Sequence, residues 1–266
     1  KDAGLYMEYS VNEMVAVEVA AGAANCGVRA LTAMKHVGLN VAADMVMTLA
    51  YVGTRGGYVI VTADDPECHS SQNEQDNRFY AMFSNLPCLE PSDPQEAKEM
   101  TVSAVEISER LELPVFLRTT TRVSHTRGPV QFGKIVKPNL KGEFIRDVKR
   151  LIMVPAFSRP KHDVLMRKMV EAKEISEKSF YNRLVRKGGE IGIISSGAAF
   201  NYAVEAANLL SIDAGFLKLG MTHPLPEGKI AEFLREHRTV VVVEELEPYL
   251  EMQIKALAKD QSPSVE

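Results

Sequence analysis

The sequence predicts an α/β protein made of two three-layer domains with mostly parallel sheets. Short apolar runs alternate along the chain with segments of helical period, which is the pattern of β-α-β units. The run at 57–63 is almost uniformly apolar, as is typical of a strand covered on both faces. Between about 124 and 187 basic residues replace the strand signals, and a second strand–helix series starts near Gly188.

The first half of the chain predicts five strands, at 5–9, 29–35, 57–63, 88–91 and 115–120. Helices are expected at 10–25, 40–51, 70–84 and 93–110. Gly27 would end the first of these helices, and Ser92 would cap the last. Because crossovers between parallel strands are right-handed, this order favours a mostly parallel sheet.

The second half predicts strands at 191–197, 214–220 and 239–245. Helices are expected at 162–185, 198–210 and 248–259, with a further helix ending near His237. These elements divide the chain into a domain at 1–130, a connecting segment at 131–187, a second domain at 188–260 and a tail at 261–266. The composition of the tail predicts disorder.

Composition indicates a globular protein, with 45% hydrophobic and 25% charged residues in a chain of 266. The net charge of -4 and the pI near 6.0 give no attraction to nucleic acid or to an anionic membrane. No apolar run reaches the ~18 residues of a membrane span, and the first residues do not form a secretory signal. The chain opens with Lys and a strand-like segment, so we expect an N-terminal piece to be missing.

The three cysteines, Cys26, Cys68 and Cys88, are widely spaced and form no CxxC motif. This usage predicts a reducing cytoplasm and argues against a complete metal or iron–sulfur site within the chain. The sequence also contains no Walker loop, GxGxxG, HExxH, GxSxG or GDG motif.

Glu13 is the first candidate catalytic residue. It begins a helical face that is otherwise made of small residues at spacings of three and four: Ala16, Ala20, Ala24 and Gly27. A carboxylate at the head of such a face could meet a ligand or a partner subunit. On spacing alone we favour the alternative, a capping box in which Glu13 bonds back to the amide of Ser10.

The segment after the second strand, 35–40, holds four candidate ligand-binding residues: Lys35, His36, Gly38 and Asn40. Gly38 could let a flat ligand approach the backbone closely. An ordinary strand–helix turn, with Asn40 as the N-cap, explains the same residues at least as well.

The richest polar cluster follows the apolar run at 57–63. Its carboxylates, histidine and amides suit the recognition of a polar substrate or general acid–base chemistry. The candidates are Asp64, Asp65, His69 and Asn73. Arg122 follows the strand at 115–120 and could hold a carboxylate in a bidentate pair. The alternatives are a capped, solvated helix start for the cluster and a surface ion pair for Arg122; Glu244 and Glu245 could line an interface.

Together these segments resemble the alpha subunits of the indolepyruvate ferredoxin oxidoreductase family, which are thiamine-diphosphate-dependent 2-oxoacid:ferredoxin oxidoreductases. YSVNEMVAVEVAAGAA, KHVGLNVAAD, VIVTADDPECHSSQNEQDNRFYA and LPVFLRTTTRVSHTRG resemble that family's pyrimidine-type domain. GGEIGIISSGAAFNYAVEA, GFLKLGMTHPLPEGKI and TVVVVEELEPYLEMQ resemble its transketolase C-terminal-like domain. The similarity covers most of the chain and is less distinctive at about 130–187.

The resemblance implies a role for Glu13 that its spacing alone does not give. In thiamine-diphosphate enzymes a glutamate at the head of this helix contacts N1′ of the aminopyrimidine, and the glycine nine residues later is also present, as Gly22. The implied activity is oxidative decarboxylation of indolepyruvate or other aryl 2-oxoacids to the acyl-CoA, with electrons passed to ferredoxin. By their position, Lys35, His36, Gly38 and Asn40 would line the cofactor, and Asp64, Asp65, His69, Asn73 and Arg122 would line the substrate. The resemblance itself assigns no individual role to His36, His69 or Arg122.

The resemblance also implies partners and parts outside this chain. The expected partners are a beta subunit, ferredoxin, coenzyme A and a second copy of the pyrimidine-type domain. The sites for Mg²⁺, the pyrophosphate and the [4Fe–4S] clusters are expected elsewhere, so these residues would supply half of a thiamine diphosphate site. Two alternatives stay open: the same chemistry on another 2-oxoacid, such as a branched-chain one, and a non-catalytic scaffold subunit.

Overall fold

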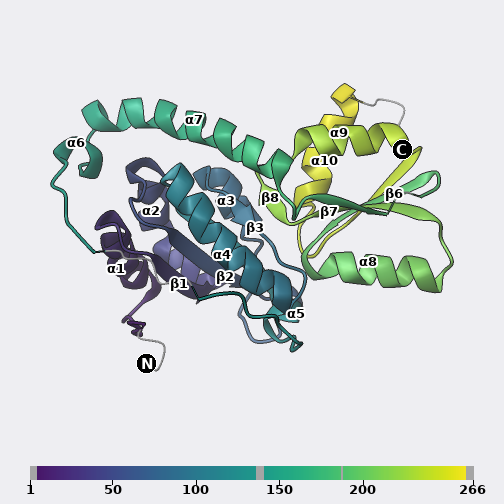
Figure 1. Ribbon diagram of the computed structural model, residues 1–266, viewed down its shortest axis with the longest axis horizontal. Helices are drawn as coiled ribbons and strands as arrows, with labels where there is room; N and C mark the ends of the chain where they lie inside the picture. Colours follow the sequence, from purple (N-terminus) through teal and green to yellow (C-terminus); the bar gives the residue numbers. More distant parts are fainter. Residues whose placement is uncertain (1–4, 136–140, 187, 262–266) are drawn as a thin grey trace.

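The computed structural model describes residues 5–135, 141–186 and 188–261, and it forms two mostly parallel sheets with helices on their faces (Figure 1). One sheet has five strands in the order β1-β2-β4-β3-β8, and the other has four in the order β5-β7-β6-β9. The predicted α/β class is confirmed.

The first sheet aligns the carboxyl ends of three neighbouring strands. β1 (Ala30–Lys35), β2 (Tyr58–Asp64) and β4 (Val115–Thr120) run parallel, and β3 (Cys88–Leu89) runs parallel to β4. Lys35 lies beside Ala63, and Ala63 lies beside Thr119. Strands in a sheet are about 4.8 Å apart, so the residues that follow these ends gather within ~10 Å along one edge.

Helices pack on both faces of this sheet. α1 (Glu13–Asn25) packs against α2 (His36–Val52), while α4 (Pro94–Leu111) packs on β2 and β4. Two short helices, α3 (Arg78–Ser84) and α5 (Thr121–Ser124), follow the loop after β2 and the end of β4, and a 3₁₀ turn, η1, lies at Pro66–Cys68. The core beneath α1 and α2 is apolar and fully buried, and includes Val17, Ala24, Leu39, Val46, Leu49 and Ile60.

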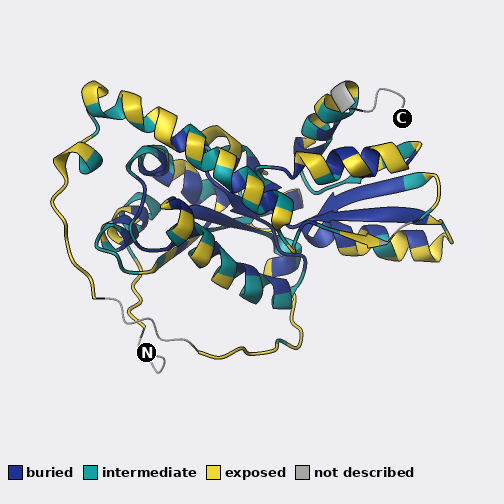
Figure 2. Ribbon diagram, turned by 45° about the horizontal axis from the view of Figure 1, so that its top comes forward, coloured by how far each residue is buried: buried dark blue, intermediate teal, exposed yellow. Residues whose placement is uncertain are grey.

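The connecting segment contains a short helix, α6 (Val148–Leu151), and a long one, α7 (Pro155–Lys178). α7 lies along the first unit against α2 and α4 and reaches the second unit (Figure 1). By contrast, the described residues between α5 and α6 run over the surface and are largely exposed (Figure 2).

The second sheet carries helices on both faces. β6 (Ile191–Ser196) runs parallel to β7 (Ala214–Leu219) and β9 (Thr239–Val243), and β5 (Arg183–Arg186) is antiparallel to β7. α8 (Gly197–Leu209) packs on β6, β7 and β9, and α9 (Glu227–Glu236) packs against α10 (Tyr249–Gln261). The core between α9, α10 and the sheet includes Ile194, Leu217, Leu219, Ile230, Phe233 and Tyr249.

Several predicted boundaries were wrong, each for a local reason. Residues 5–9 form no strand and are exposed, because no neighbouring strand pairs with them. α2 begins at His36 directly after β1, without a polar side-chain cap, so Asn40 lies inside the helix. Residues 70–77 are irregular, and α3 starts only at Arg78. The cap of α4 is Asp93, not Ser92. The helix expected at 162–185 runs instead from Pro155 to Lys178, and residues 183–185 belong to strand β5 (Arg183–Arg186).

The predicted domain limits remain a prediction, and both sheets cross them. β5 lies within the segment expected to connect the domains, yet it pairs with β7. β8 (Met221–His223) follows β7 and pairs with β3 of the first sheet. Of the tail expected at 261–266, Gln261 is the last residue of α10, and the rest lies outside the described residues. No helix of the described part is long and apolar enough to cross a membrane.

Candidate active site

The candidate residues gather along the carboxyl edge of the first sheet, where β1, β2 and β4 end. α2, the irregular loop at 65–77 and α5 follow these strands directly. Open parallel sheets bind ligands beyond this edge, because the chain leaves each strand there in loops and helix N-termini. Lys35 and Asp64 are the last residues of β1 and β2, and the other candidates follow the strand ends or lie on the neighbouring α1.

Glu13 is the first residue of α1, and its side chain lies against Gly38 of α2. A Cβ atom on Gly38 would come within 2.6 Å of Glu13 Cγ and 2.8 Å of its Oε1. The capping box is wrong: the N-cap is Asn12, whose Oδ1 accepts from Val15 N at 2.9 Å. Within the described residues, the half-buried Glu13 carboxylate has no side-chain hydrogen bond or ion pair. Gly38 therefore gives space to the carboxylate, which is left free to bind a ligand.

The first turn of α2 is bound to the loop at 65–77 by amide and imidazole contacts. His36 is fully buried, and its Nε2 lies 3.0 Å from the carbonyl oxygen and 3.1 Å from Oδ1 of Asn73. Its Nδ1 is also buried and has no hydrogen-bond partner among the described residues. Asn40 exchanges two hydrogen bonds of 2.9 Å with Gln75. These contacts place the loop over the start of α2.

Asp65, the first residue of the same loop, accepts hydrogen bonds from other residues of the loop. It is buried and accepts hydrogen bonds from Ser70 N, Ser71 Oγ and Thr121 Oγ1, each at 2.8 Å. Burial opposes ionisation of Asp65, but these hydrogen bonds outweigh it and hold its pKa below the usual carboxyl range. Lys35 donates to both serine hydroxyls at 2.7 Å. Asp65 and Lys35 thus hold the loop in place.

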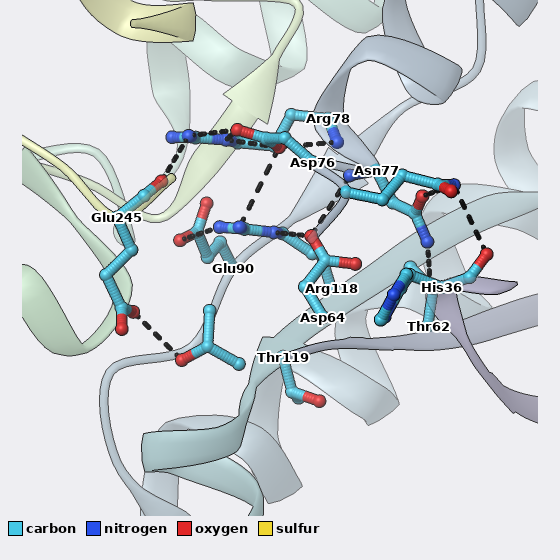
Figure 3. A network of polar contacts seen from close by, with 12 residues as sticks. His36, Thr62, Asp64, Asp76, Asn77, Arg78, Glu90, Arg118, Thr119 and Glu245 are labelled. Atoms are coloured by element: carbon cyan, nitrogen blue, oxygen red, sulfur yellow. Dashed lines mark hydrogen bonds and ion pairs between the residues drawn. The ribbon is translucent and has the colours of Figure 1, made fainter. Parts of the chain in front are cut away.

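Asp64 belongs to a buried network that the sequence reading did not foresee (Figure 3). Arg118 of β4 lies between two carboxylates: its Nε donates to Asp64 at 2.7 Å and its Nη1 to Glu90 at 2.6 Å. Burial raises the pKa of both carboxyl groups despite the adjacent guanidinium. One oxygen of each has no hydrogen-bond partner among the described residues. A charged residue inside the apolar run VFLRTT was the available signal, since buried arginines need buried carboxylates.

The network continues into the second unit through Arg78, which is fully buried. Arg78 pairs with Asp76 and with Glu244 Oε2 at 2.8 Å, and it donates to the carbonyl oxygens of Glu245 and Glu247. Glu90 also lies against Gly197 at the start of α8. Both units are therefore joined by buried charged groups directly behind the candidate site. The sequence reading named Glu244 and Glu245 as possible interface residues, and they do lie at this joint.

Arg122 lies farther along the edge, in α5, facing the second unit. Its Nη1 pairs with Glu245 at 2.7 Å and its Nη2 with Glu67 at 3.2 Å. His69 is exposed and lies 3.6 Å from Glu67. The structure thus brings five candidates together around the loop at 65–77: Lys35, His36, Asn40, Asp65 and Asn73. Glu13 and Gly38 lie beside this loop. Arg122 lines a separate cavity, and Asp64 is part of the buried network.

Comparison with known proteins identifies the group to which this architecture belongs. Residues 5–178 match the family model described as pyruvate flavodoxin/ferredoxin oxidoreductase, thiamine diphosphate-binding. The chain belongs to this family. The match spans the first sheet except β8, together with α7, and so includes Glu13 and the loop at 65–77.

The curated relatives carry one name. A protein of Methanothermobacter thermautotrophicus named indolepyruvate oxidoreductase subunit IorA is 51% identical over 260 residues, which are 97% of this chain and 42% of the relative. The Pyrococcus abyssi protein of the same name is 46% identical over 271 residues, covering 99% of this chain and 42% of the relative. The chain thus spans about two fifths of the length of these relatives.

Solved structures share the fold at low sequence identity. A 2-oxoglutarate:ferredoxin oxidoreductase from Magnetococcus marinus superposes with a TM-score of 0.72 at 15% identity, over 99% of this chain and 53% of that one. A split-gene transketolase superposes with a TM-score of 0.61 at 16% identity, over 96% and 71% of the two chains. Both likenesses extend over nearly all of this chain, so the arrangement of the two units recurs in other proteins.

Proposed function

We propose that this chain supplies the aminopyrimidine-binding half of the active site of a thiamine-diphosphate-dependent 2-oxoacid:ferredoxin oxidoreductase that acts on indolepyruvate or related aryl 2-oxoacids. The observation that carries the proposal is the Glu13 carboxylate, which lies on Gly38 and has no side-chain hydrogen bond or ion pair among the described residues. The family match and the names of the relatives support the same assignment. The products would be the acyl-CoA, carbon dioxide and reduced ferredoxin.

The residues present fit the pyrimidine half of thiamine diphosphate. Glu13 has a free carboxylate that can bind a ring nitrogen, and Gly38 leaves the space in which a larger side chain would displace it. When bound, the cofactor supplies the nucleophilic carbon and the electron sink for decarboxylation. Glu13 would orient the ring and hold a proton at the ring nitrogen that it contacts. The α2 start and its loop would exclude water from one side.

The other candidate residues divide by how the structure uses them. Lys35, His36 and Asn40 fix the loop beside the cofactor position, and they remain proposed cofactor-site residues together with Gly38. Asp64 and Asp65 are buried and hydrogen-bonded within the protein. We propose that these two act on the substrate indirectly, by supporting the loop that presents Asn73 and His69.

The remaining parts of the reaction are assigned outside these 266 residues. Mg²⁺ and the pyrophosphate of the cofactor would bind elsewhere, as would the [4Fe–4S] clusters. A beta subunit, ferredoxin, coenzyme A and a second copy of the pyrimidine-type domain are the proposed partners. The relatives are more than twice as long as this chain, and their names refer to a subunit, which supports this division.

Substitution of Glu13 tests the proposal, with Glu18 as a matched control. Glu18 is an exposed carboxylate on the same helix. In the assembled enzyme, Glu13→Gln should lower kcat for indolepyruvate by about 10²-fold or more, since removal of a group that moves a proton has this scale. Glu18→Gln should leave kcat unchanged. Near-normal turnover by the Glu13→Gln enzyme would refute the assignment.

Two further measurements separate the alternatives. Calorimetric titration of the complex with thiamine diphosphate should show weaker binding for Glu13→Ala than for wild type; equal binding would favour a scaffold subunit. Comparison of kcat/KM for indolepyruvate, phenylpyruvate, 2-oxoisovalerate and pyruvate should rank the aryl acids first. A preference for pyruvate would overturn the substrate assignment.

A further inference from the structure

A cavity of about 540 Å³ opens between the two units, at the end of the sheet edge away from Glu13. One wall is formed by the start of the loop after β2 and by α5. The other wall is formed by α8, which lies beside α5 in Figure 1, and by the end of β9 with the residues that follow it. The lining residues are Pro66, Glu67, Glu74, Arg122, Ala199, Tyr202, Val243, Glu244, Glu245 and Leu246. Of these described residues, Arg122 is the one with a cationic side chain.

The two ion pairs of Arg122 differ in how easily they can be exchanged. The Glu245 side chain is only 10% exposed, and its second oxygen accepts from Thr120 Oγ1 at 2.9 Å. Glu67 is 66% exposed, and its contact with Arg122 is longer, at 3.2 Å. Exposed ion pairs contribute little, so an incoming carboxylate can take the place of Glu67 on Nη2. Glu245 meanwhile keeps the guanidinium in position.

The other acidic groups on the wall are already engaged. Glu244 pairs with Arg78 and accepts from the backbone amides of Leu250 and Glu251. Glu74 accepts from the amide of Glu67. The exchangeable anion in the cavity is therefore Glu67, and its removal would leave half of the Arg122 fork open to a ligand carboxylate.

The remaining walls are apolar and aromatic. Tyr202 of α8 is 55% exposed, and its ring centroid lies 6.0 Å from the Arg122 guanidinium carbon. Ala199, Val243 and Leu246 line the same space. A planar aromatic ring fits beside an exposed tyrosine and small apolar groups, because offset or edge contacts between rings add to the burial of apolar area.

We propose that this cavity binds the aryl 2-oxoacid across both units, with Arg122 holding its carboxylate, Tyr202 contacting its ring and Glu67 acting as the displaceable counter-ion. The inference rests on the proposed function and adds Tyr202 as the residue that determines the preference for aryl side chains. Glu67 holds a left-handed backbone at φ 69° without being a helix cap, as does Leu246 on the opposite wall at φ 70°. Such strain clusters at ligand sites.

The kinetic experiment compares Tyr202 variants in the assembled enzyme on two substrates. Tyr202→Ala should lower kcat/KM for indolepyruvate about tenfold and for 2-oxoisovalerate less than about twofold, on the scale of one lost aromatic contact. Tyr202→Phe should keep both values. Leu209→Ala, at an exposed apolar residue of the same helix outside the cavity, is the matched control and should change neither. Equal effects of Tyr202→Ala on both substrates would overturn the inference.

The role of Glu67 gives a second, opposite result. Glu67→Gln should lower KM for indolepyruvate about threefold, because the competing carboxylate is removed from Arg122. Arg122→Met should raise KM for both 2-oxoacids. An increase in KM for Glu67→Gln would show that Glu67 supports the site instead of competing for it, and would refute this part of the inference.

A binding measurement separates failure of this inference from failure of the proposed function. Indole-3-propionate keeps an aromatic ring and a carboxylate but has no keto group to react, so its binding to the assembled enzyme can be followed by calorimetric titration. Compared with wild type, the Tyr202→Ala enzyme should bind this probe about tenfold more weakly, and the Leu209→Ala enzyme should bind it equally well. If the enzyme turns over indolepyruvate normally but Tyr202→Ala binds this probe as wild type does, the site is wrong while the proposed function stands.

Discussion

Replacement of Gly38 by Ala should separate activity from stability. A Cβ atom at this position would lie 2.6 Å from Glu13 Cγ, whereas ordinary contacts begin at 3.4 Å. The Glu13 side chain must therefore retreat by about 0.8 Å. It is a flexible side chain without other described partners, so the retreat costs little folding energy. Gly38 lies inside α2, where alanine is favoured by up to about 1 kcal/mol. The variant should be as stable as wild type or slightly more stable.

The same displacement should lower catalysis. Misplacement of a reacting group by about 1 Å can reduce rate by about 10²-fold, so we expect kcat/KM to fall by about ten- to a hundredfold. Indolepyruvate-dependent reduction of ferredoxin by the assembled enzyme measures the rate, and urea unfolding measures stability.

Gly22→Ala is the control for this substitution. Gly22 also lies in a helix, α1, but a Cβ there meets nothing within 4 Å. This variant should gain stability and keep its activity. Full activity of Gly38→Ala would refute the role given to the contact with Glu13, as would a loss of activity that is matched by unfolding.

Three further substitutions probe the joint between the two units. Gly197→Ala should lower the free energy of unfolding by about 2–4 kcal/mol, since Gly197 has φ +53° and its Cβ would lie 2.5 Å from a buried oxygen of Glu90; a loss below about 1 kcal/mol in urea unfolding would show that the joint relaxes freely. Arg78→Met should cost about 3–5 kcal/mol, because it leaves Asp76 and Glu244 buried without their cation; a smaller loss, with the two units still unfolding together, would contradict this. Burial raises the pKa of Glu90 in the folded protein. Above about pH 4.3, the pKa of a glutamate in the unfolded chain, the unfolded chain has therefore released a proton that folded Glu90 still holds. Stability due to Glu90 is therefore present below that pH and falls as pH rises toward the folded pKa. Glu90→Gln should accordingly gain stability relative to wild type as the pH rises above about 4.3, the pKa of a glutamate in the unfolded chain, and parallel pH profiles of Tm would disprove it.

The strands were predicted well because their signal is local. The almost uniformly apolar run at 57–63 predicted a strand covered on both faces, and β2 is largely buried there. Helix starts were predicted less well. α2 follows β1 without a turn, and its N-cap, Lys35, makes no side-chain hydrogen bond, so no capping residue marks the boundary. At 5–9 a strand was predicted where the structure has none, because a strand-like composition is insufficient without a neighbouring strand to pair with.

The candidate site was found in part. The sequence indicated Glu13 and the loop after β2 as candidates, and the family resemblance gave Glu13 its role. Spacing could not show that Gly38 faces Glu13, because the contact joins two helices. Spacing also could not distinguish the roles of the two adjacent carboxylates: Asp64 pairs with Arg118 in the buried network, and Asp65 holds the loop. Tyr202 was not among the candidate residues, and only the packing of α8 beside α5 brings it near Arg122.

The pairing of β8 with β3 governs the order in which this chain can mature during synthesis. Residues 221–223 leave the ribosome about 130 residues after β3, so the outer edge of β3 stays open while this stretch is made. At about 5–20 residues per second this wait lasts some seconds, long enough for an open edge to recruit foreign strands. β3 is only two residues long, and such brevity is one way in which nascent proteins keep a waiting edge from aggregating.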